Sequence, residues 1–213
     1  MKMRKIVVLF IFTVFIACTG QASAFTRFTQ NPTQNLFITA ESLDPGMTQT
    51  GIQFTLGEHY KNYYPEIRYG LGAFFEVGVK FGVVAADVNS DNKIGALAGV
   101  DLKYQLIKET EGVPLDMAVD VGFDNVLMSK RNSSELSFTT VFSKGFPLTE
   151  RGYKFTPYCG LEMASYSGSA VASNNTIYGI GGLEWKITQQ FMIMLEFKGG
   201  KSDVGGIGIR FEY

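Results

Sequence analysis

The chain is poor in several residue types, and each shortage excludes a class of protein. It has only two cysteines, one histidine and six prolines among 213 residues. Cys18 lies in an N-terminal secretory segment, which leaves Cys159 alone and excludes an intramolecular disulfide framework. The formal net charge of −1 gives no electrostatic reason to expect nucleic acid as a partner. Low-complexity stretches and tandem repeats are absent, so the sequence indicates one domain.

Long apolar runs are also missing after residue 24. The nearest candidate, residues 73–86, is interrupted by Glu76 and Lys80. It is shorter than the roughly 20 residues that a membrane-spanning helix needs. The sequence therefore predicts no membrane-spanning helix beyond the secretory segment.

The N-terminus has the pattern of a cleaved signal peptide. A basic start precedes an uninterrupted apolar run over residues 6–17, and Ala22-Ser23-Ala24 supplies the small residues that signal peptidase requires. The sequence therefore predicts a signal peptide at residues 1–24 and a mature chain that begins at Phe25. A second route stays open, because Phe15-Ile16-Ala17-Cys18 is a loose lipoprotein-type box that would place a lipid on Cys18.

What the chain has in abundance is strict alternation of apolar with small or charged residues. Successive side chains of a strand point to opposite faces, so in residues 206–213 all the apolar side chains share one face. The same alternation runs over residues 75–83, 115–123 and 191–197, and no charge falls on their apolar faces. The sequence predicts ten strands, near residues 50–57, 64–71, 75–85, 95–106, 115–124, 135–143, 153–166, 176–187, 191–198 and 204–213.

These strands define the domain organisation. Residues 25–48 form an irregular lead-in, with a short strand expected at 36–40, and residues 49–213 form an antiparallel up-and-down β-barrel of about ten strands. Eight or twelve strands also satisfy the pattern.

Alternation alone does not say which face of the barrel is outside. A soluble lipocalin-like barrel has the same period with its apolar face inward. Two features favour a membrane barrel instead. Glycines such as Gly78, Gly99 and Gly182 fall on the polar face, where they weaken a solvated strand but make room in a crowded lumen. With both termini periplasmic, aromatic residues gather at the periplasmic strand ends like an aromatic girdle: Tyr69, Phe75, Tyr104, Phe142, Tyr153, Phe155, Trp185, Phe191 and Tyr213.

With these features the chain resembles the small outer-membrane β-barrel proteins of Gram-negative bacteria. One motif carries the resemblance, the terminal series Ile207, Ile209, Phe211 and Tyr213, which is similar to the family's C-terminal assembly signal. Phenylalanine is the more usual last residue of that signal. The resemblance implies a location in the outer membrane, with its lipid and its assembly machinery as partners.

The polar face carries both signs of charge, often two residues apart on one strand, as in Glu66/Arg68. We expect a narrow lumen filled by ion pairs, and hence a structural or porin-like role without covalent chemistry. A narrow passive channel for small solutes and a soluble periplasmic lipid-binding barrel stay open, and the oligomeric state is not assigned. The expected lumen charges are Glu66, Arg68, Glu76, Lys80, Asp101, Lys103, Asp116, Asp120, Lys154, Glu162, Glu184, Lys186, Glu196, Lys198, Arg210 and Glu212.

Candidates for catalysis or metal binding are weak. His59 is the single histidine and has no serine at a recognisable spacing. The loop with Asp87, Asn89, Asp91 and Asn92 lacks the glycine and terminal glutamate of a calcium loop. We therefore assign no catalytic, cofactor or metal site.

Two expectations concern single residues on the two faces. Cys159 falls on the lipid face, where a thiol behaves as a small apolar group. A Gly78→Ala substitution on the polar face is expected to be mild.

Overall fold

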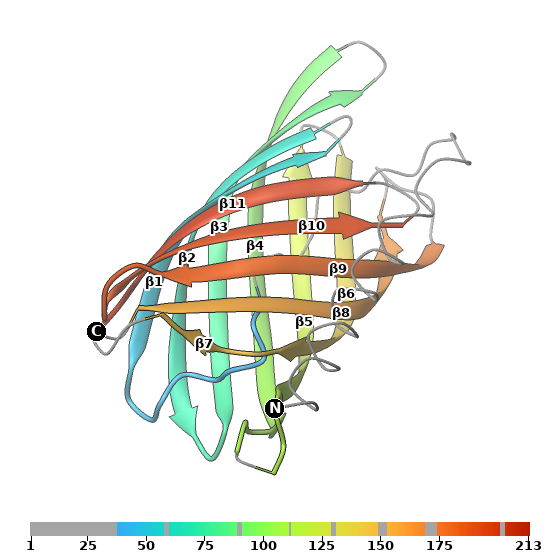
Figure 1. Cartoon of the computed structure of the whole chain (residues 1–213). Helices are drawn as coiled ribbons and strands as arrows, with labels where there is room; N and C mark the ends of the chain where they lie inside the picture. The colour runs from blue at the N-terminus through green and yellow to red at the C-terminus, as the bar shows by residue number, and fades with distance from the viewer. Residues whose placement is uncertain are drawn as a thin grey trace.

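The computed structural model (Figure 1) describes residues 38–57, 60–88, 91–110, 112–128, 131–148, 153–168, 174–200 and 203–213. The strands are β1 (Thr48–Gly57), β2 (Tyr60–Gly72), β3 (Phe75–Val88), β4 (Asp91–Ile107), β5 (Asp116–Met128), β6 (Arg131–Ser143), β7 (Phe146–Pro147), β8 (Lys154–Ser167), β9 (Asn174–Lys186), β10 (Phe191–Gly199) and β11 (Val204–Glu212). In these ranges no helix is long and apolar enough to cross a membrane.

Ten of these strands form a closed antiparallel barrel, which confirms the predicted fold. Neighbours in sequence pair around the ring, β1 closes it by pairing with β11, and β6 pairs with β8 across the short β7. Strand β7 lies outside the ring and pairs only with the start of β8. The prediction missed it, because two residues are too few to show a period.

The apolar face of the barrel points outward and the charged face points inward. On β3, Val79 is 51% exposed while its neighbour Lys80 is 4% exposed. Among the strand residues whose side chains the structure describes, the one exposed charged residue is Lys61, at the start of β2. A soluble lipocalin-like barrel requires the reverse arrangement, because water would face its outer surface.

Several strands are longer than the sequence predicts, and most of the added length lies at the end opposite the termini. Strand β2 begins at Tyr60 rather than 64, and β3 and β4 stay paired as far as Val88 and Asp91. Polar residues near the hairpin tips resemble loop composition, but their backbones can still pair when the hairpin extends into water.

Aromatic residues ring the end of the barrel where β1 begins and β11 ends, here called the terminal end. Phe75 stacks on Tyr104 with ring centroids 4.4 Å apart, and Phe191 lies 5.1 Å from Phe211. Rings at this level combine an apolar body with, in tyrosine and tryptophan, a polar tip, which suits a membrane interface.

The segment before β1 has no strand, which corrects the expected strand at 36–40 for the residues that the structure describes. Residues 38–44, here called the strap, turn back from β1 and enter the barrel at its terminal end (Figure 1). Ala40 is fully buried and its amide donates to the Ser143 hydroxyl on β6, 3.2 Å away. The signal peptide and Cys18 lie outside the described residues.

Candidate functional site

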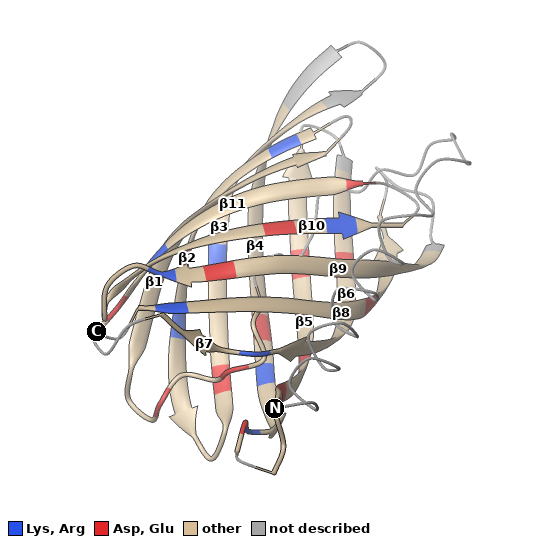
Figure 2. Cartoon of the chain, in the orientation of Figure 1, with Lys and Arg blue, Asp and Glu red and all other residues tan. Residues whose placement is uncertain are grey.

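The barrel interior is filled with charged side chains, and Figure 2 shows both signs on neighbouring strands. All the expected lumen charges are buried except Lys154, Lys186 and Glu212, which are half-buried at the terminal end. The structure adds two carboxylates that the sequence analysis missed, Asp124 and Glu135, each 1% exposed. Their signal was present, because Asp124 is the last residue of the strand predicted at 115–124 and continues the alternation of its polar face.

A repeated contact, here called a glycine crossing, organises these charges. Arg68 on β2 is level with Gly78 on β3, which is level with Asp101 on β4. The guanidinium passes over the glycine and donates to both carboxylate oxygens of Asp101, with Nη1 to Oδ2 at 3.4 Å. Adjacent strands are about 4.8 Å apart, so only a long side chain over an uncovered backbone spans two of them.

The crossing recurs around the barrel with the same strand spacing. Lys80 passes over Gly99 to Asp124 at 2.6 Å, and the Tyr158 hydroxyl passes over Gly182 to Glu196 at 2.7 Å. The remaining example is Arg210, which reaches Glu66 over Gly51. These glycines are therefore part of the ion-pair network rather than weak points in strands.

Gly78→Ala should therefore destabilise the barrel, which reverses the mild effect expected from the sequence. A methyl group at position 78 would lie 2.4 Å from Asp101 Oδ2 and 2.9 Å from Arg68 Nη1. Overpacking of this kind costs about 2 kcal/mol. The free energy of urea unfolding in detergent measures the effect. Gly205→Ala is the matched control, because nothing lies within 4 Å of a methyl group there, and equal stability of the two variants would contradict the crossing.

Further ion pairs extend the network towards the strap and occupy the opposite wall. Lys103 binds Glu76 at 2.9 Å, and Arg68 also donates to Glu76. On the opposite wall, Lys198 of β10 binds Glu162 of β8 at 2.7 Å, and both side chains are fully buried. Buried charges persist only when they are paired and hydrogen-bonded in this way.

Carboxylates nevertheless outnumber basic groups among the buried described residues. Both carboxylate oxygens of Asp120 lack a hydrogen-bond partner there, although the side chain is fully buried. An interior with more carboxylates than bases attracts cations. The carboxylates are Glu66, Glu76, Asp101, Asp116, Asp120, Asp124, Glu135, Glu162, Glu184 and Glu196, and the bases are Arg68, Lys80, Lys103, Lys198 and Arg210.

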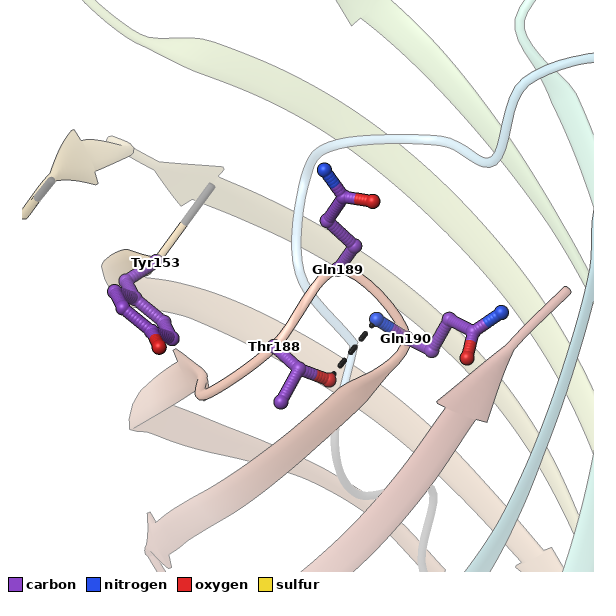
Figure 3. A pocket seen from close by; sticks show the side chains of 4 residues that line it. All are labelled: Tyr153, Thr188, Gln189 and Gln190. Atoms are coloured by element: carbon purple, nitrogen blue, oxygen red, sulfur yellow. Dashed lines mark hydrogen bonds between the residues drawn. The ribbon is translucent and has the colours of Figure 1, made fainter. Parts of the chain in front are cut away.

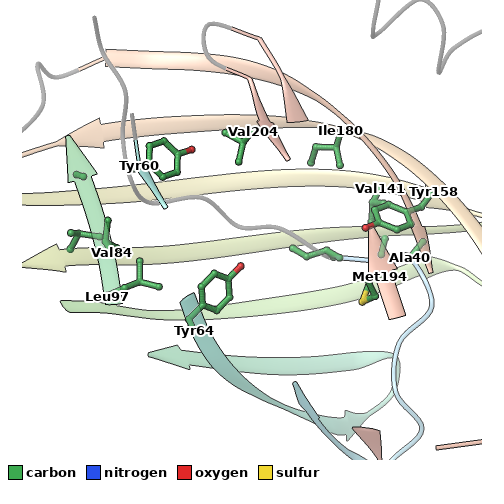
Figure 4. Packing of buried hydrophobic residues seen from close by; sticks show 14 residues of the cluster. Ala40, Tyr60, Tyr64, Val84, Leu97, Val141, Tyr158, Ile180, Met194 and Val204 are labelled. Carbon is green, nitrogen blue, oxygen red and sulfur yellow. The ribbon is translucent and has the colours of Figure 1, made fainter. Parts of the chain in front are cut away.

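Apolar and tyrosine side chains fill the space between the charges. Figure 4 shows Ala40 of the strap on the same side as Val141, Tyr158 and Met194, and all four are buried in one cluster. Lys80 lies 5.5 Å from the ring centroid of Tyr64, a cation–π distance. Apolar and tyrosine side chains thus share the interior with the charged groups.

Polar contacts hold the strap across the terminal end. The Lys103 ammonium donates to the carbonyls of Thr39 at 3.3 Å and Glu41 at 2.8 Å. The Leu43 amide donates to Glu76 Oε2 at 3.0 Å. The strap is therefore hydrogen-bonded to the same carboxylate that pairs with Lys103 of the barrel wall. Closer to the rim, the Lys154 ammonium binds the carboxylate of Glu41.

Two hollows lie at the terminal end. One, of about 330 Å³, lies between the strap and the inner wall, and Glu184, Lys186, Met192 and Glu212 are among its lining residues. The other, of about 420 Å³, is an open groove beside the β9–β10 turn (Figure 3). Tyr153 and residues 188–190 line that groove.

The residues considered for catalysis or metal binding are only partly described. His59 and Asn89 lie outside the described residues, and Asp87 and Asp91 belong to β3 and β4 rather than to a loop. Across the described ranges, no group of three or more His, Cys, Asp or Glu side chains is arranged to hold a metal ion. Cys159 is half-buried on β8 and forms no disulfide within the described residues.

Comparison with solved structures finds outer-membrane barrels. The N-terminal β-barrel domain of OprF from Pseudomonas aeruginosa is 14% identical with a TM-score of 0.41, covering 80% of this chain and 100% of that one. The KdgM porin is 12% identical (TM-score 0.41, 76% of this chain and 98% of that one). An outer membrane channel from Pseudomonas putida F1 is 11% identical (TM-score 0.44, 82% of this chain and 98% of that one).

The chain thus has an architecture seen in outer-membrane β-barrel proteins. No family model and no curated protein sequence matches it. Likeness at these identities and TM-scores assigns no solute or activity to the present chain.

Proposed function

We propose that the chain is an outer-membrane barrel with a structural or porin-like role, no covalent chemistry and a lumen closed by ion pairs and by the strap. The observation that carries the proposal is the inverted distribution of side chains. Large apolar groups cover the outside, and charged groups such as Lys198 and Glu162 are fully buried inside. Such a surface matches hydrocarbon, and such an interior leaves little continuous space for solutes.

The proposal extends to location and partners. A signal peptide at residues 1–24 would export the chain, and the aromatic girdle would set its depth in the outer membrane. The terminal series that ends at Tyr213 would be recognised by the outer-membrane assembly machinery. Neither nucleic acid nor a cofactor enters the proposal.

The second candidate is a narrow passive channel for small solutes. The excess of buried carboxylates favours it, because an acidic lumen attracts cations and repels anions. The hollow beside the strap also favours the channel, because the hollow is an open space at one end of the lumen.

Conductance in planar lipid bilayers distinguishes the two candidates. A closed lumen predicts little or no steady conductance for the wild type. Lys80→Ala would leave Asp124, which is 1% exposed, without its 2.6 Å ion pair. Breaking one side of a buried pair costs about 3–5 kcal/mol and makes room for water, so conductance should rise as stability falls.

The matched control is Lys61→Ala, which removes an exposed lysine from the same barrel and should change neither quantity. A variant that lacks every residue before Asp44 tests the strap, and its conductance should also exceed that of the wild type. Stable single-channel steps from the wild type would overturn the closed lumen, above all if Lys80→Ala changed only the preference for cations over anions. The passive channel would then be the better description.

A further inference from the structure

The hollow between the strap and the inner wall has the size of a binding site. Its volume of about 330 Å³ is far larger than the roughly 30 Å³ that one water molecule occupies in the liquid. It therefore has room for a small organic molecule. Its walls come from the strap on one side and from β1, β8, β9, β10 and β11 on the other.

A buried carboxylate lines this hollow and has no donor. Glu184 on β9 is 8% exposed, and no hydrogen bond or ion pair joins it to any residue that the structure describes. Three basic groups, Arg210, Lys154 and Lys103, lie near enough to interact with it electrostatically, as does the carboxylate of Glu41. A buried carboxylate in this position is unfavourable unless a group in the hollow, such as water or a cation, donates hydrogen bonds to it.

Each of those basic groups is already bound to another carboxylate. Lys154 binds Glu41 of the strap, Arg210 binds Glu66, and Lys103 binds Glu76. Lys186, beside Glu184 in the lining, binds Glu212 at 3.1 Å. The remaining lysine of the lining, Lys108, is exposed. The hollow therefore presents one buried carboxylate, that of Glu184, which the nearby lysines and Arg210 leave without a hydrogen bond.

We propose that this hollow binds a small primary amine, with its ammonium group on the carboxylate of Glu184. An ammonium has three donors and would supply the hydrogen bonds that Glu184 lacks. A metal ion fits less well, because the described residues offer no cluster of three ligands and the space exceeds a single ion. Leu43 and Met192 add apolar surface for the methylene groups of an alkyl chain.

The site does not rest on conduction, so its test is separate from the bilayer experiment. Isothermal titration of the full mature protein, refolded in detergent, uses 1,4-diaminobutane as the probe and 1,4-butanediol as its uncharged counterpart at equal ionic strength. We expect saturable binding of the diamine and none of the diol. Glu184→Gln keeps the shape but removes the charge, and it should weaken binding about tenfold or more.

Two further variants test whether binding depends on the carboxylate of Glu184. Asp203→Asn removes an exposed carboxylate at the far end of the barrel and should leave binding unchanged. Glu41→Gln releases Lys154, which can then turn to Glu184, so this exposed substitution should weaken binding without unfolding the barrel. Equal binding of diamine and diol, undiminished binding by Glu184→Gln, or no binding by the wild type would each overturn the proposal.

Discussion

Arginine at position 79 should prevent the chain from inserting as a folded barrel. Val79 is 51% exposed on the outer face of β3, four residues from the girdle residue Phe75. A charge near the bilayer midplane costs about 2–4 kcal/mol on such a face. Leu195→Arg, on the opposite part of the ring, should behave in the same way. Heat modifiability on a gel measures the result, because a folded barrel migrates differently before and after boiling.

Ile94→Arg is the matched control for both substitutions. Ile94 is 75% exposed on β4, opposite Ala85, six residues along β3 from position 79. At about 3.3 Å per residue and a tilt near 40°, it lies roughly 15 Å farther along the barrel axis, at the far edge of an apolar band about 25 Å tall. The control should therefore fold normally. A soluble, folded protein with arginine at 79 and 195 would show that water, not lipid, faces this surface.

Strand positions could be predicted because the outer face imposes a strict requirement. Every second residue of a strand such as β10 must be apolar where it meets lipid, and that period survives in the sequence. The hairpin tips carry no such requirement, so the predicted bounds fell short there. The strap could not be predicted for a related reason. Its residues 38–44 are held by single contacts to wall residues such as Lys103 and Glu76, not by a periodic face.

The sequence also could not predict which charged side chains form ion pairs with one another. Neighbours two residues apart on one strand, such as Asp101 and Lys103, lie about 6.6 Å apart, whereas residues level on adjacent strands lie about 5 Å apart. Lys103 accordingly binds Glu76, its level neighbour on β3. The glycine crossings extend this rule to a second strand, and they depend on register, which one strand's sequence does not contain.

Removing Phe211 to Tyr213 should abolish assembly in the outer membrane. These residues close the seam of the barrel, since the Thr48 amide donates to the Tyr213 carbonyl at 2.8 Å and the Tyr213 amide returns a bond to Thr48 at 2.9 Å. Their loss leaves unpaired backbone groups that lipid cannot satisfy. It also removes the proposed end of the assembly signal. The truncated chain should collect in the periplasm or be degraded, as cell fractionation would show.

A second variant separates the seam from the signal. Phe211→Ser keeps the backbone pairing of β11 with β1 and β10 but removes the exposed ring that contacts Phe191. If the terminal series is read by the assembly machinery, this variant should be depleted from the outer membrane in cells yet refold in detergent, where no machinery is needed. Tyr213→Phe is the control and should assemble as well as the wild type, because it keeps an aromatic terminal residue. Normal outer-membrane levels of the truncated chain would refute both roles of this terminus. Poor refolding of Phe211→Ser in detergent would assign the defect to the seam alone.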